Sequence, residues 1–287
     1  MRLVRFGVRG RERPGLMKAD HQVLDVSSVV DDYDSRFWGE GGAAFVAAEL
    51  RAGRLDRLPL VDAASVRLGS PVARPGKLIC VGLNYRDHAA ETGAKVPDKP
   101  VLFTKAVTAI NGPNDDIVLP SNYSTTDWEV ELAFVIGPRA RRVSRERALE
   151  HVAGYLICHD VSERQAQIHE GGQWFRGKSF DTYGPLGPWV ATPDEVGDPH
   201  ALDLTLEVNG ERMQTGSTKT LIFGIPELVE FVSRNVTLEP GDVISTGTPP
   251  GVGHARKPPR YLQPGDVVDL QVTKLGAQRA KVVRESD

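Results

Sequence analysis

The sequence T-D-W-E-V-E-L-A-F-V-I-G occupies residues 126–137. Val, Phe, Ile and Trp dominate it, and Gly137 followed by Pro138 ends it, so the pattern predicts a β-strand. Because side chains alternate faces along a strand, Glu129 and Glu131 share one face. That face becomes apolar further along the strand, so we expect both carboxylates to point into the protein.

The two carboxylates of this strand would repel each other. Residues two apart on a strand are separated by roughly 6.5 to 7 Å, and burial together with a like charge disfavours the ionised form. A divalent cation between Glu129 and Glu131 would remove the conflict, and oxygen-only ligands suit Mg²⁺, Mn²⁺ or Ca²⁺. The alternative is an edge strand whose glutamates face water.

Length and composition indicate a globular protein of ordinary charge. With 287 residues the chain can bury a sizeable core. Its net charge of −3 gives no overall electrostatic reason to bind nucleic acid or an anionic membrane. Cys80 and Cys158 lie in apolar runs without metal-ligand spacing, which is typical of a reducing compartment. No apolar run approaches membrane-spanning length and the first residues lack a signal core, so we expect a cytoplasmic protein.

The chain divides into two predicted units. Short strands at 3–6 and 23–26 and a helix over 42–51 predict a small N-terminal α/β unit spanning residues 1–72. Prolines then mark a linker. Residues 73–287 form the larger predicted domain, and the 29 glycines and 20 prolines of the chain favour many short strands.

Three further elements are predicted in the larger domain. Asn209-Gly210 is a strong turn signal between two short apolar runs and predicts a hairpin. Residues 224–236 have helical apolar spacing and a proline in the first turn. The Pro-Gly pairs at 240–241 and 264–265 predict type II turns, and 267–283 predicts a final strand pair.

A candidate acid–base pair follows the buried strand at residues 77–82. If residues 85–91 are helical, His88 and Glu91 lie three positions apart on the same side. A histidine oriented by a carboxylate is the usual general base near neutral pH, and flanking glycines are typical of a mobile lid. The alternative is a surface helical turn with an ion pair.

Asp160 stands at the end of a second buried strand, at residues 154–160. Ser162 and Gln165 fit a capping box, which predicts a helix start just beyond it. A strand end followed by a helix start commonly carries a site residue, so Asp160 is a candidate third metal ligand. The alternative is a turn aspartate that stabilises the helix start.

Two glycine-containing segments have the composition of pocket walls. Residues 171–185 combine glycines, aromatics and cations, too irregularly for a helix or a long strand. Lys178 within it is a candidate for holding an anionic group, against the alternative of a solvated loop lysine. Residues 245–253 are rich in glycine without the Gly-Lys-Ser/Thr of a phosphate loop. Their glycines would allow backbone N–H groups and the Thr248 hydroxyl to approach a small ligand, against the alternative of an ordinary tight loop.

Taken together, these segments resemble the fumarylacetoacetate hydrolase family over about residues 75–270. The resemblance is carried by five motifs in register: G-L-N-Y-R-D-H-A-A-E (82–91), D-W-E-V-E-L-A-F-V-I-G (127–137), D-V-S-E-R (160–164), G-K-S-F-D-T-Y-G-P-L-G-P (177–188) and T-G-T-P-P-G-V-G (246–253). It implies a mixed, β-rich α+β fold with a β-sandwich roll in the larger domain, and a homodimer.

The resemblance also implies roles for particular residues. It makes Glu129, Glu131 and Asp160 the ligands of Mg²⁺ or Mn²⁺. It makes His88 and Glu91 a water-activating pair on a lid, and Lys178 a catalytic residue that stabilises an oxyanion. The expected substrate contacts are Thr248, Arg86, Arg164, Gln167 and Tyr183. Where the family commonly has Asn before the aspartate, this chain has His159.

The activity implied by the resemblance is metal-dependent hydrolysis of a carbon–carbon bond in a small 2-oxo acid with a second keto group, releasing pyruvate or a related 2-oxo acid. The full-length pattern is similar to the acylpyruvate hydrolase branch that cleaves 2,4-diketo-3-deoxy sugar acids such as the fuconate derivative. Three alternatives stay open: an oxaloacetate-type decarboxylase, a dehydratase or isomerase, and a non-catalytic binding protein stabilised by a metal.

Overall fold

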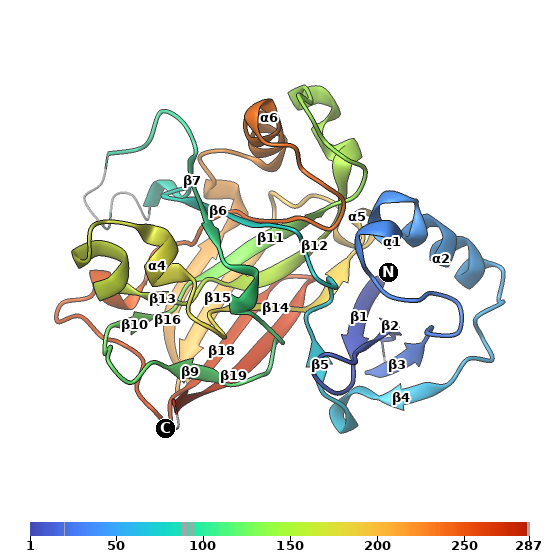
Figure 1. The fold of residues 1–287 in the computed structure, drawn as a ribbon, viewed down its shortest axis with the longest axis horizontal. Coiled ribbons are helices and arrows are strands. Elements are labelled where there is room, and N and C mark those ends of the chain that lie inside the picture. The colour runs from blue at the N-terminus through green and yellow to red at the C-terminus, as the bar shows by residue number, and fades with distance from the viewer. Residues whose placement is uncertain (20, 88–90, 92–94, 286–287) are drawn as a thin grey trace.

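The protein is rich in β-strands and has few, short helices (Figure 1). The structure is a computed structural model that describes residues 1–19, 21–87, 91 and 95–285. In this part of the chain the strands are β1 (Arg2–Phe6), β2 (Arg13–Met17), β3 (Gln22–Asp25), β4 (Leu60–Asp62), β5 (Leu68–Gly69), β6 (Leu78–Gly82), β7 (Val101–Lys105), β8 (Ile110–Asn111), β9 (Ile117–Leu119), β10 (Thr126–Asp127), β11 (Val130–Ile136), β12 (Val152–His159), β13 (Ser162–Glu163), β14 (Gly184–Ala191), β15 (Asp203–Val208), β16 (Glu211–Ser217), β17 (Val243–Ser245), β18 (Val267–Val272) and β19 (Gly276–Arg284). The α-helices are α1 (Ser35–Gly39), α2 (Gly42–Arg51), α4 (Trp174–Lys178), α5 (Pro193–Val196) and α6 (Ile225–Asn235). There are also 3-10 helices η1 (Ala63–Ser65), η2 (Val107–Ala109), η3 (Arg145–His151), η5 (Thr218–Thr220) and η6 (Gly253–Ala255) and a π-helix η4 (Gln165–His169).

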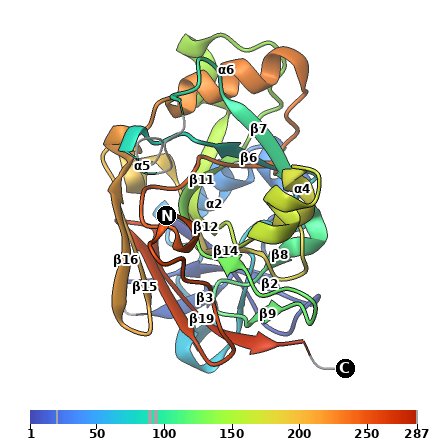
Figure 2. The ribbon, with the colours of Figure 1, turned by 90° about the vertical axis from the view of Figure 1, so that its left-hand side faces the viewer.

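Two large sheets form the layers of the fold, and β10 and β13 form a separate two-stranded sheet among the described residues. Among the described residues the larger sheet has 12 strands along the path β4-β3-β2-β1-β14-β12-β11-β17-β6-β7, with β5 paired to β1 and β8 to β14. The second has five strands in the order β16-β15-β18-β19-β9. Figure 2 shows this second sheet along one side of the molecule, where β15 packs against β11 and β19 against β14. The mixed, β-rich α+β fold predicted from the sequence is confirmed.

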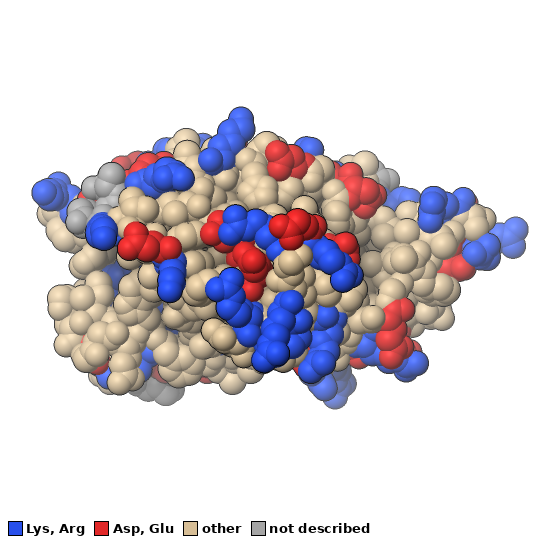
Figure 3. Space-filling model, turned by 90° about the horizontal axis from the view of Figure 1, so that it is seen from above, with Lys and Arg blue, Asp and Glu red and all other residues tan. Residues whose placement is uncertain are grey.

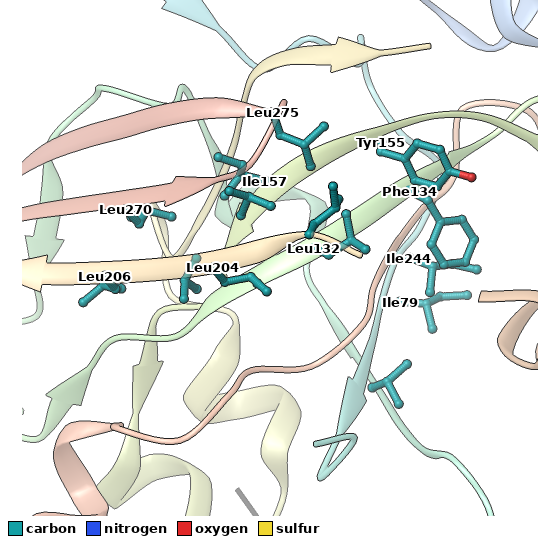
Figure 4. Packing of buried hydrophobic residues seen from close by; sticks show 14 of the residues in the cluster. Ile79, Leu132, Phe134, Tyr155, Ile157, Leu204, Leu206, Ile244, Leu270 and Leu275 are labelled. Atoms are coloured by element: carbon teal, nitrogen blue, oxygen red, sulfur yellow. The ribbon is translucent and has the colours of Figure 1, made fainter. Parts of the chain in front are cut away.

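The main core lies between the two sheets. Figure 4 shows Leu204 of β15 next to Leu132 of β11, with Ile157 of β12 and Leu270 of β18 in the same layer. All of these side chains are buried. On the other face of β11, Ala133 and its neighbours pack against helices of the N-terminal part. Because β11 is buried on both faces, its sequence is almost continuously apolar.

The stretch at 126–137 is two strands rather than the single predicted strand. Asp127 ends β10, and its Oδ1 accepts hydrogen bonds from the backbone N–H groups of Trp128 (2.8 Å) and Gly253 (2.6 Å). These side-chain contacts replace ladder bonds, so β11 begins only at Val130. The predicted alternation of faces is confirmed, because Trp128 and Val130 belong to the core between the sheets and Ala133 to the opposite one.

The N-terminal residues contribute to the same sheet as the larger part of the chain. Strand β1 pairs with β2 on one side and with β14 on the other. Phe37 and Trp38 of α1 and Val46 of α2 pack in one cluster with Leu78 and with residues of β11. The division of the chain at residue 72 stays a prediction.

Two local predictions are wrong and two are confirmed. Ser162 does not cap a helix, because it lies in β13 and its Oγ donates to the carbonyl oxygen of Asp160 (2.9 Å). Residues 174–178 form a short helix inside the segment predicted to be irregular, where Trp174 packs edge-on against Phe103 with ring centroids 5.3 Å apart. The hairpin at Asn209-Gly210 and helix α6 are as predicted.

The surface carries charges of both signs. Figure 3, viewed from above, shows Lys and Arg side chains beside Asp and Glu side chains on one face. Arg145 lies 3.0 Å from Glu227, and Arg139 lies 3.1 Å from Glu239. None of the helices in the described part of the chain combines the length and apolar composition that a bilayer crossing requires.

Replacing Leu132 by Ala should destabilise the protein strongly, because Leu132 is fully buried between the sheets. We expect the free energy of unfolding to fall by about 2–5 kcal/mol, measured by urea denaturation followed by circular dichroism. Leu149→Ala is the control, since Leu149 is 48% exposed, and should change it by less than about 0.5 kcal/mol. Equal effects of the two substitutions would contradict the assigned core.

Candidate active site

A cavity of about 670 Å³ lies where the central strands meet α4 and the glycine-rich segment. This volume is typical of sites for small molecules. Among the described residues, it is lined by Val81, Gly82, Leu83, Glu91, Phe103, Glu129, Glu131, Asp160, Arg164, Gln167, Ile168, Trp174, Lys178, Thr248, Val252, His254, Ala255 and Lys257.

Three buried carboxylates converge in this cavity. Glu129, Glu131 and Asp160 each offer an oxygen, and these oxygens lie within 4.8 Å of one another. The register of β11 and β12 brings them together, because Glu131 pairs with Cys158 and the Asp160 N–H donates to the Glu129 carbonyl oxygen (3.0 Å). The three predicted metal ligands, from two separate segments, therefore share one space.

Two buried lysines neutralise part of this acidic cluster. Lys178 Nζ lies 2.7 Å from Glu129 Oε2 and 2.7 Å from Asp160 Oδ2. Lys105 Nζ donates to Asp160 Oδ1 (2.5 Å) and to the Val161 carbonyl oxygen (3.0 Å). Burial alone would lower the pKa of Lys178, but Asp160 and Glu129 raise it above its usual value. Lys178 therefore stays charged inside the cavity.

Arg164 supplies a third buried positive charge. Its Nη2 lies 2.6 Å from Glu129 Oε1, and its Nε donates to Asp127 Oδ2 (2.9 Å). Burial would raise the pKa of Glu129, but Lys178 and Arg164 outweigh it and lower the pKa to about 2. Glu129 is therefore ionised at neutral pH.

Glu131 has a different environment from the other two acids. Its Oε2 accepts hydrogen bonds from Ser245 Oγ (2.5 Å) and Gly247 N (3.0 Å), and none of the described basic residues forms an ion pair with it. Burial and then the charges of Asp160 and Glu129 raise its pKa well above the ordinary range. A divalent cation would remove this penalty, and three carboxylate oxygens are ligands that hard cations prefer. The donor set thus fits such a cation.

Of the two residues predicted to form the acid–base pair on a lid, the structure describes Glu91. His88 lies outside the described residues. Glu91 lines the cavity, and both its oxygens accept the N–H of Gly251, at 3.0 and 3.1 Å. Gly251 has φ +104°, and a Cβ there would collide with the Met213 carbonyl oxygen, so only glycine fits this position. Arg86 is exposed and is absent from the described lining of the cavity.

The other expected contacts divide into two groups. Thr248 and Gln167 line the cavity. Thr248 Oγ1 donates to the Val130 carbonyl oxygen (3.0 Å), and Gln167 Oε1 accepts from Arg164 (2.9 Å). Tyr183 is instead fully buried and is absent from the described lining of the cavity, and its Oη lies 2.7 Å from Thr126 Oγ1.

Sequence reasoning missed three polar residues of this region. Lys105 is the last residue of β7, and a charged residue at the end of this short strand was its only signal. Gln214 is fully buried and donates to Thr248 Oγ1 (2.8 Å), but an alternating hairpin strand gives no hint of this. Asp127 is the first residue of the central-strand motif at 127–137, where it was given no role, and its carboxylate binds Arg164.

His159 does not belong to the cavity. It pairs with Val130 across the β11–β12 ladder, and directly opposite residues share a face, so its ring points into the core between the sheets. Neither ring nitrogen has a hydrogen-bond partner among the described residues. Burial and then Lys105 lower its pKa to about 3, so the imidazole is neutral.

Comparison with known proteins agrees with this geometry. Residues 77–283 match the family model described as fumarylacetoacetate (FAA) hydrolase C-terminal. The chain is 49% identical to 2,4-didehydro-3-deoxy-L-rhamnonate hydrolase of Sphingomonas sp. (strain SKA58), covering 98% of this chain and 96% of that protein.

Solved structures resemble the chain over its whole length. Fumarylacetoacetate hydrolase from Exiguobacterium antarcticum has a TM-score of 0.86 at 39% identity, covering 99% of this chain and 100% of that one. Maleylpyruvate hydrolase from Sphingobium sp. SYK-6, in complex with manganese (II) ion and pyruvate, has a TM-score of 0.81 at 31% identity, covering both chains fully (100%). Other similar structures are named isomerases. The chain belongs to the fumarylacetoacetate hydrolase family, whose members are hydrolases or isomerases.

Proposed function

We propose that this protein is a metal-dependent hydrolase that cleaves a carbon–carbon bond in a 2,4-diketo acid and releases pyruvate or a related 2-oxo acid. The observation that carries the proposal is the convergence of three buried carboxylates and a buried, charged Lys178 in one cavity. Similarity to a hydrolase of a didehydro-deoxy sugar acid, and to a hydrolase solved with manganese and pyruvate, supports it.

Glu129, Glu131 and Asp160 would hold the cation, either Mg²⁺ or Mn²⁺. When bound, a divalent cation supplies Lewis-acid polarisation of a substrate carbonyl oxygen. The protein's own side chains and backbone hold the three carboxylates in position. Arg164 holds Glu129 in place, and Ser245 with Gly247 N orients Glu131, so the acidic oxygens keep their positions without a ligand.

Lys178 is the proposed oxyanion-stabilising group. Attack of water on the carbonyl farther from the carboxylate places negative charge on its oxygen, and a fixed buried ammonium stabilises that charge. Lys178 is 2% exposed and its Nζ is already oriented by two carboxylates. It therefore meets the developing charge with little rearrangement.

His88 and Glu91 are the proposed water-activating pair. The two hydrogen bonds from Gly251 N fix the Glu91 carboxylate beside the cavity. In the proposed step an imidazole nitrogen of His88 takes a proton from the attacking water, and Glu91 stabilises the resulting charge. The carbon–carbon bond then breaks, giving a carboxylic acid and the enolate of the 2-oxo acid, which is protonated.

The direct test is to assay acylpyruvates and oxaloacetate with Mg²⁺, with Mn²⁺ and with EDTA. We expect metal-dependent cleavage of acylpyruvates, with carboxylic acid and 2-oxo acid formed in equal amounts. Loss of oxaloacetate alone would replace the proposal with a decarboxylase. Absence of turnover on every substrate would favour a non-catalytic binding protein.

Glu131→Gln should stabilise the metal-free protein and abolish its response to metal. A raised pKa means that folding favours the protonated acid, so stability from Glu131 is lost as pH rises above the ordinary value of 4.5. Glutamine mimics the protonated form. In calorimetry with EDTA, the Tm of the variant should therefore exceed that of wild type, by a difference that grows from pH 5 toward pH 8. We expect about 2–4 °C for each kcal/mol by which the substitution stabilises the folded protein.

With Mg²⁺ or Mn²⁺ the Tm of wild type should exceed that of Glu131→Gln, because only the wild-type protein gains binding energy from the ion. Glu40→Gln is the control, since Glu40 is 69% exposed on the surface. A metal-induced rise in Tm for Glu131→Gln equal to that of wild type would remove Glu131 from the ligand set.

Lys178→Met should separate catalysis from metal binding. Loss of a buried oxyanion donor typically lowers kcat about 10²–10³-fold. Metal affinity, measured by isothermal titration calorimetry, should be unchanged or tighter, because the ammonium competes with the cation for Glu129 and Asp160. Parallel loss of metal binding and turnover would instead make Lys178 a structural residue.

A further inference from the structure

Gln214 of β16 connects the second sheet to two segments that carry the site. Its side chain is fully buried, and β16 is an edge strand of that sheet (Figure 2). Its Oε1 accepts a hydrogen bond from the Val130 N–H (2.9 Å), and its Nε2 donates to Thr248 Oγ1 (2.8 Å) and to the Pro249 carbonyl oxygen (2.8 Å). One buried amide therefore binds both the start of the central strand and the glycine-rich segment of the cavity.

The hydrogen bonds around Gln214 have a fixed direction. The Val130 N–H can only donate and the Pro249 carbonyl oxygen can only accept, so a single orientation of the amide satisfies both. Nε2 then also donates to Thr248 Oγ1, which donates its own hydrogen to the Val130 carbonyl oxygen (3.0 Å). The Thr248 hydroxyl is thus held from two sides, and its position depends on Gln214.

Val130 lies between two of the candidate metal ligands, Glu129 and Glu131. Strand β17 pairs with β11 at residues 133–135 and not at Val130. At this point the side chains of Gln214 and Thr248 bind the N–H and the carbonyl oxygen that a neighbouring strand would otherwise bind. Gln214 therefore also fixes the backbone between the two carboxylates.

A β-bulge in β16 accounts for the inward direction of Gln214. In the β15–β16 ladder Gln214 pairs with Leu206, a residue of the core between the sheets. The next pair is Arg212 with Glu207, so Met213 is an extra residue in β16. Met213 and Gln214 are consecutive and yet both are buried. Bulges re-aim side chains in this way and are frequent beside active sites.

The same strand also fits closely against the glycine-rich segment. A Cβ at Gly216 would collide with Pro249, and a Cβ at Gly251 would collide with the Met213 carbonyl oxygen. Neither position has room for a side chain. The Gly251 N–H in turn donates to both oxygens of Glu91. By placing this segment, β16 therefore also affects the position of Glu91.

We propose that Gln214 is a positioning residue of the active site. Its amide holds Thr248 and the glycine-rich segment at a fixed distance from the central strand, and in this way sets the affinity for the substrate. This inference rests on the proposed function and on the expected contact of Thr248 with the substrate. It adds that β16, which contributes no residue to the described cavity lining, determines how tightly the substrate binds.

The test begins with Gln214→Met, which keeps the length of the side chain and removes its hydrogen bonds to Val130, Thr248 and Pro249. With saturating Mg²⁺, KM for the acylpyruvate that is cleaved best should rise about three- to tenfold, the factor typical of losing one or two hydrogen bonds. Because the lost interaction concerns binding, kcat should stay within about threefold.

Thr248→Val removes the hydroxyl that Gln214 holds and should raise KM to a similar extent. In the double variant KM should not rise beyond that of Thr248→Val, because both substitutions break the same connection. A residue that only stabilises the fold would instead give additive changes.

Gln278→Met is the matched control. Gln278 is a buried glutamine of β19 in the same sheet, and its Nε2 donates to the carbonyl oxygens of Ile157 (3.2 Å) and Gly187 (3.0 Å). These residues are absent from the described cavity lining. The substitution should lower Tm about as much as Gln214→Met and leave KM unchanged.

Hydrogen–deuterium exchange of the metal-free protein gives a readout that does not need turnover. Deuterium uptake by residues 246–253 should rise in Gln214→Met and match wild type in Gln278→Met. If Gln214→Met does not fold, Gln214→Glu takes its place, since its carboxyl keeps an acceptor for the Val130 N–H. Its KM relative to wild type should then rise with pH, because an ionised carboxylate cannot donate to Thr248.

Equal changes in KM for Gln214→Met and Gln278→Met, or additive changes in the double variant, would overturn the inference and leave the proposed function intact. If wild type cleaves no acylpyruvate with any metal, the proposed function fails. In that case the exchange of residues 246–253 still decides the positioning role, and unchanged uptake in Gln214→Met would overturn it.

Discussion

Pairing of buried charge is the constraint on which the site depends. Carboxylates removed from water are costly unless cations or hydrogen-bond donors compensate them. Asp160 is held by Lys105 and Lys178, and Glu129 by Lys178 and Arg164. Within the part of the chain that the structure describes, Glu131 accepts hydrogen bonds from a hydroxyl and a backbone N–H and has no cationic partner. Among the described residues, cations therefore pair with Glu129 and Asp160 but not with Glu131, which is the arrangement expected of a site that takes up a divalent ion.

The sheet explains why the protein can maintain this energetically unfavourable cluster of buried carboxylates. Strand β11 is buried on both faces and lies between β12 and β17, so its backbone is fixed on both edges. The β12 partner brings Asp160 beside Glu129, and β17 is followed by the glycine-rich segment that supplies Gly247 N. The interruption between β10 and β11 lies next to Asp127, whose carboxylate orients Arg164. Core packing and site geometry thus share the same strands.

Membership of the family narrows the chemistry to that of hydrolases or isomerases. The buried part of the cavity contains the three carboxylates and Lys178 on which the proposed function rests. Similar proteins carry names that refer to a didehydro-deoxy sugar acid and to maleylpyruvate.

The sequence by itself determined much of this protein. Residue alternation in 126–137 predicted which side chains of the central strand share a face, and the Asn209-Gly210 turn and helix α6 were predicted from local signals. These features depend on neighbours along the chain. The motifs, taken in order, also indicated the family and the three acidic residues.

Only the tertiary structure decided how the charges are shared. Lys105, Asp127 and Gln214 lie far in sequence from the residues they contact, and no local pattern reports a partner that distant. For the same reason the capping box at Ser162 was wrong, since pairing of β13 with β10 overrode a local signal. Alternation predicted that Glu129 and Glu131 point inward, but the register between β11 and β12 determined that Asp160 joins them.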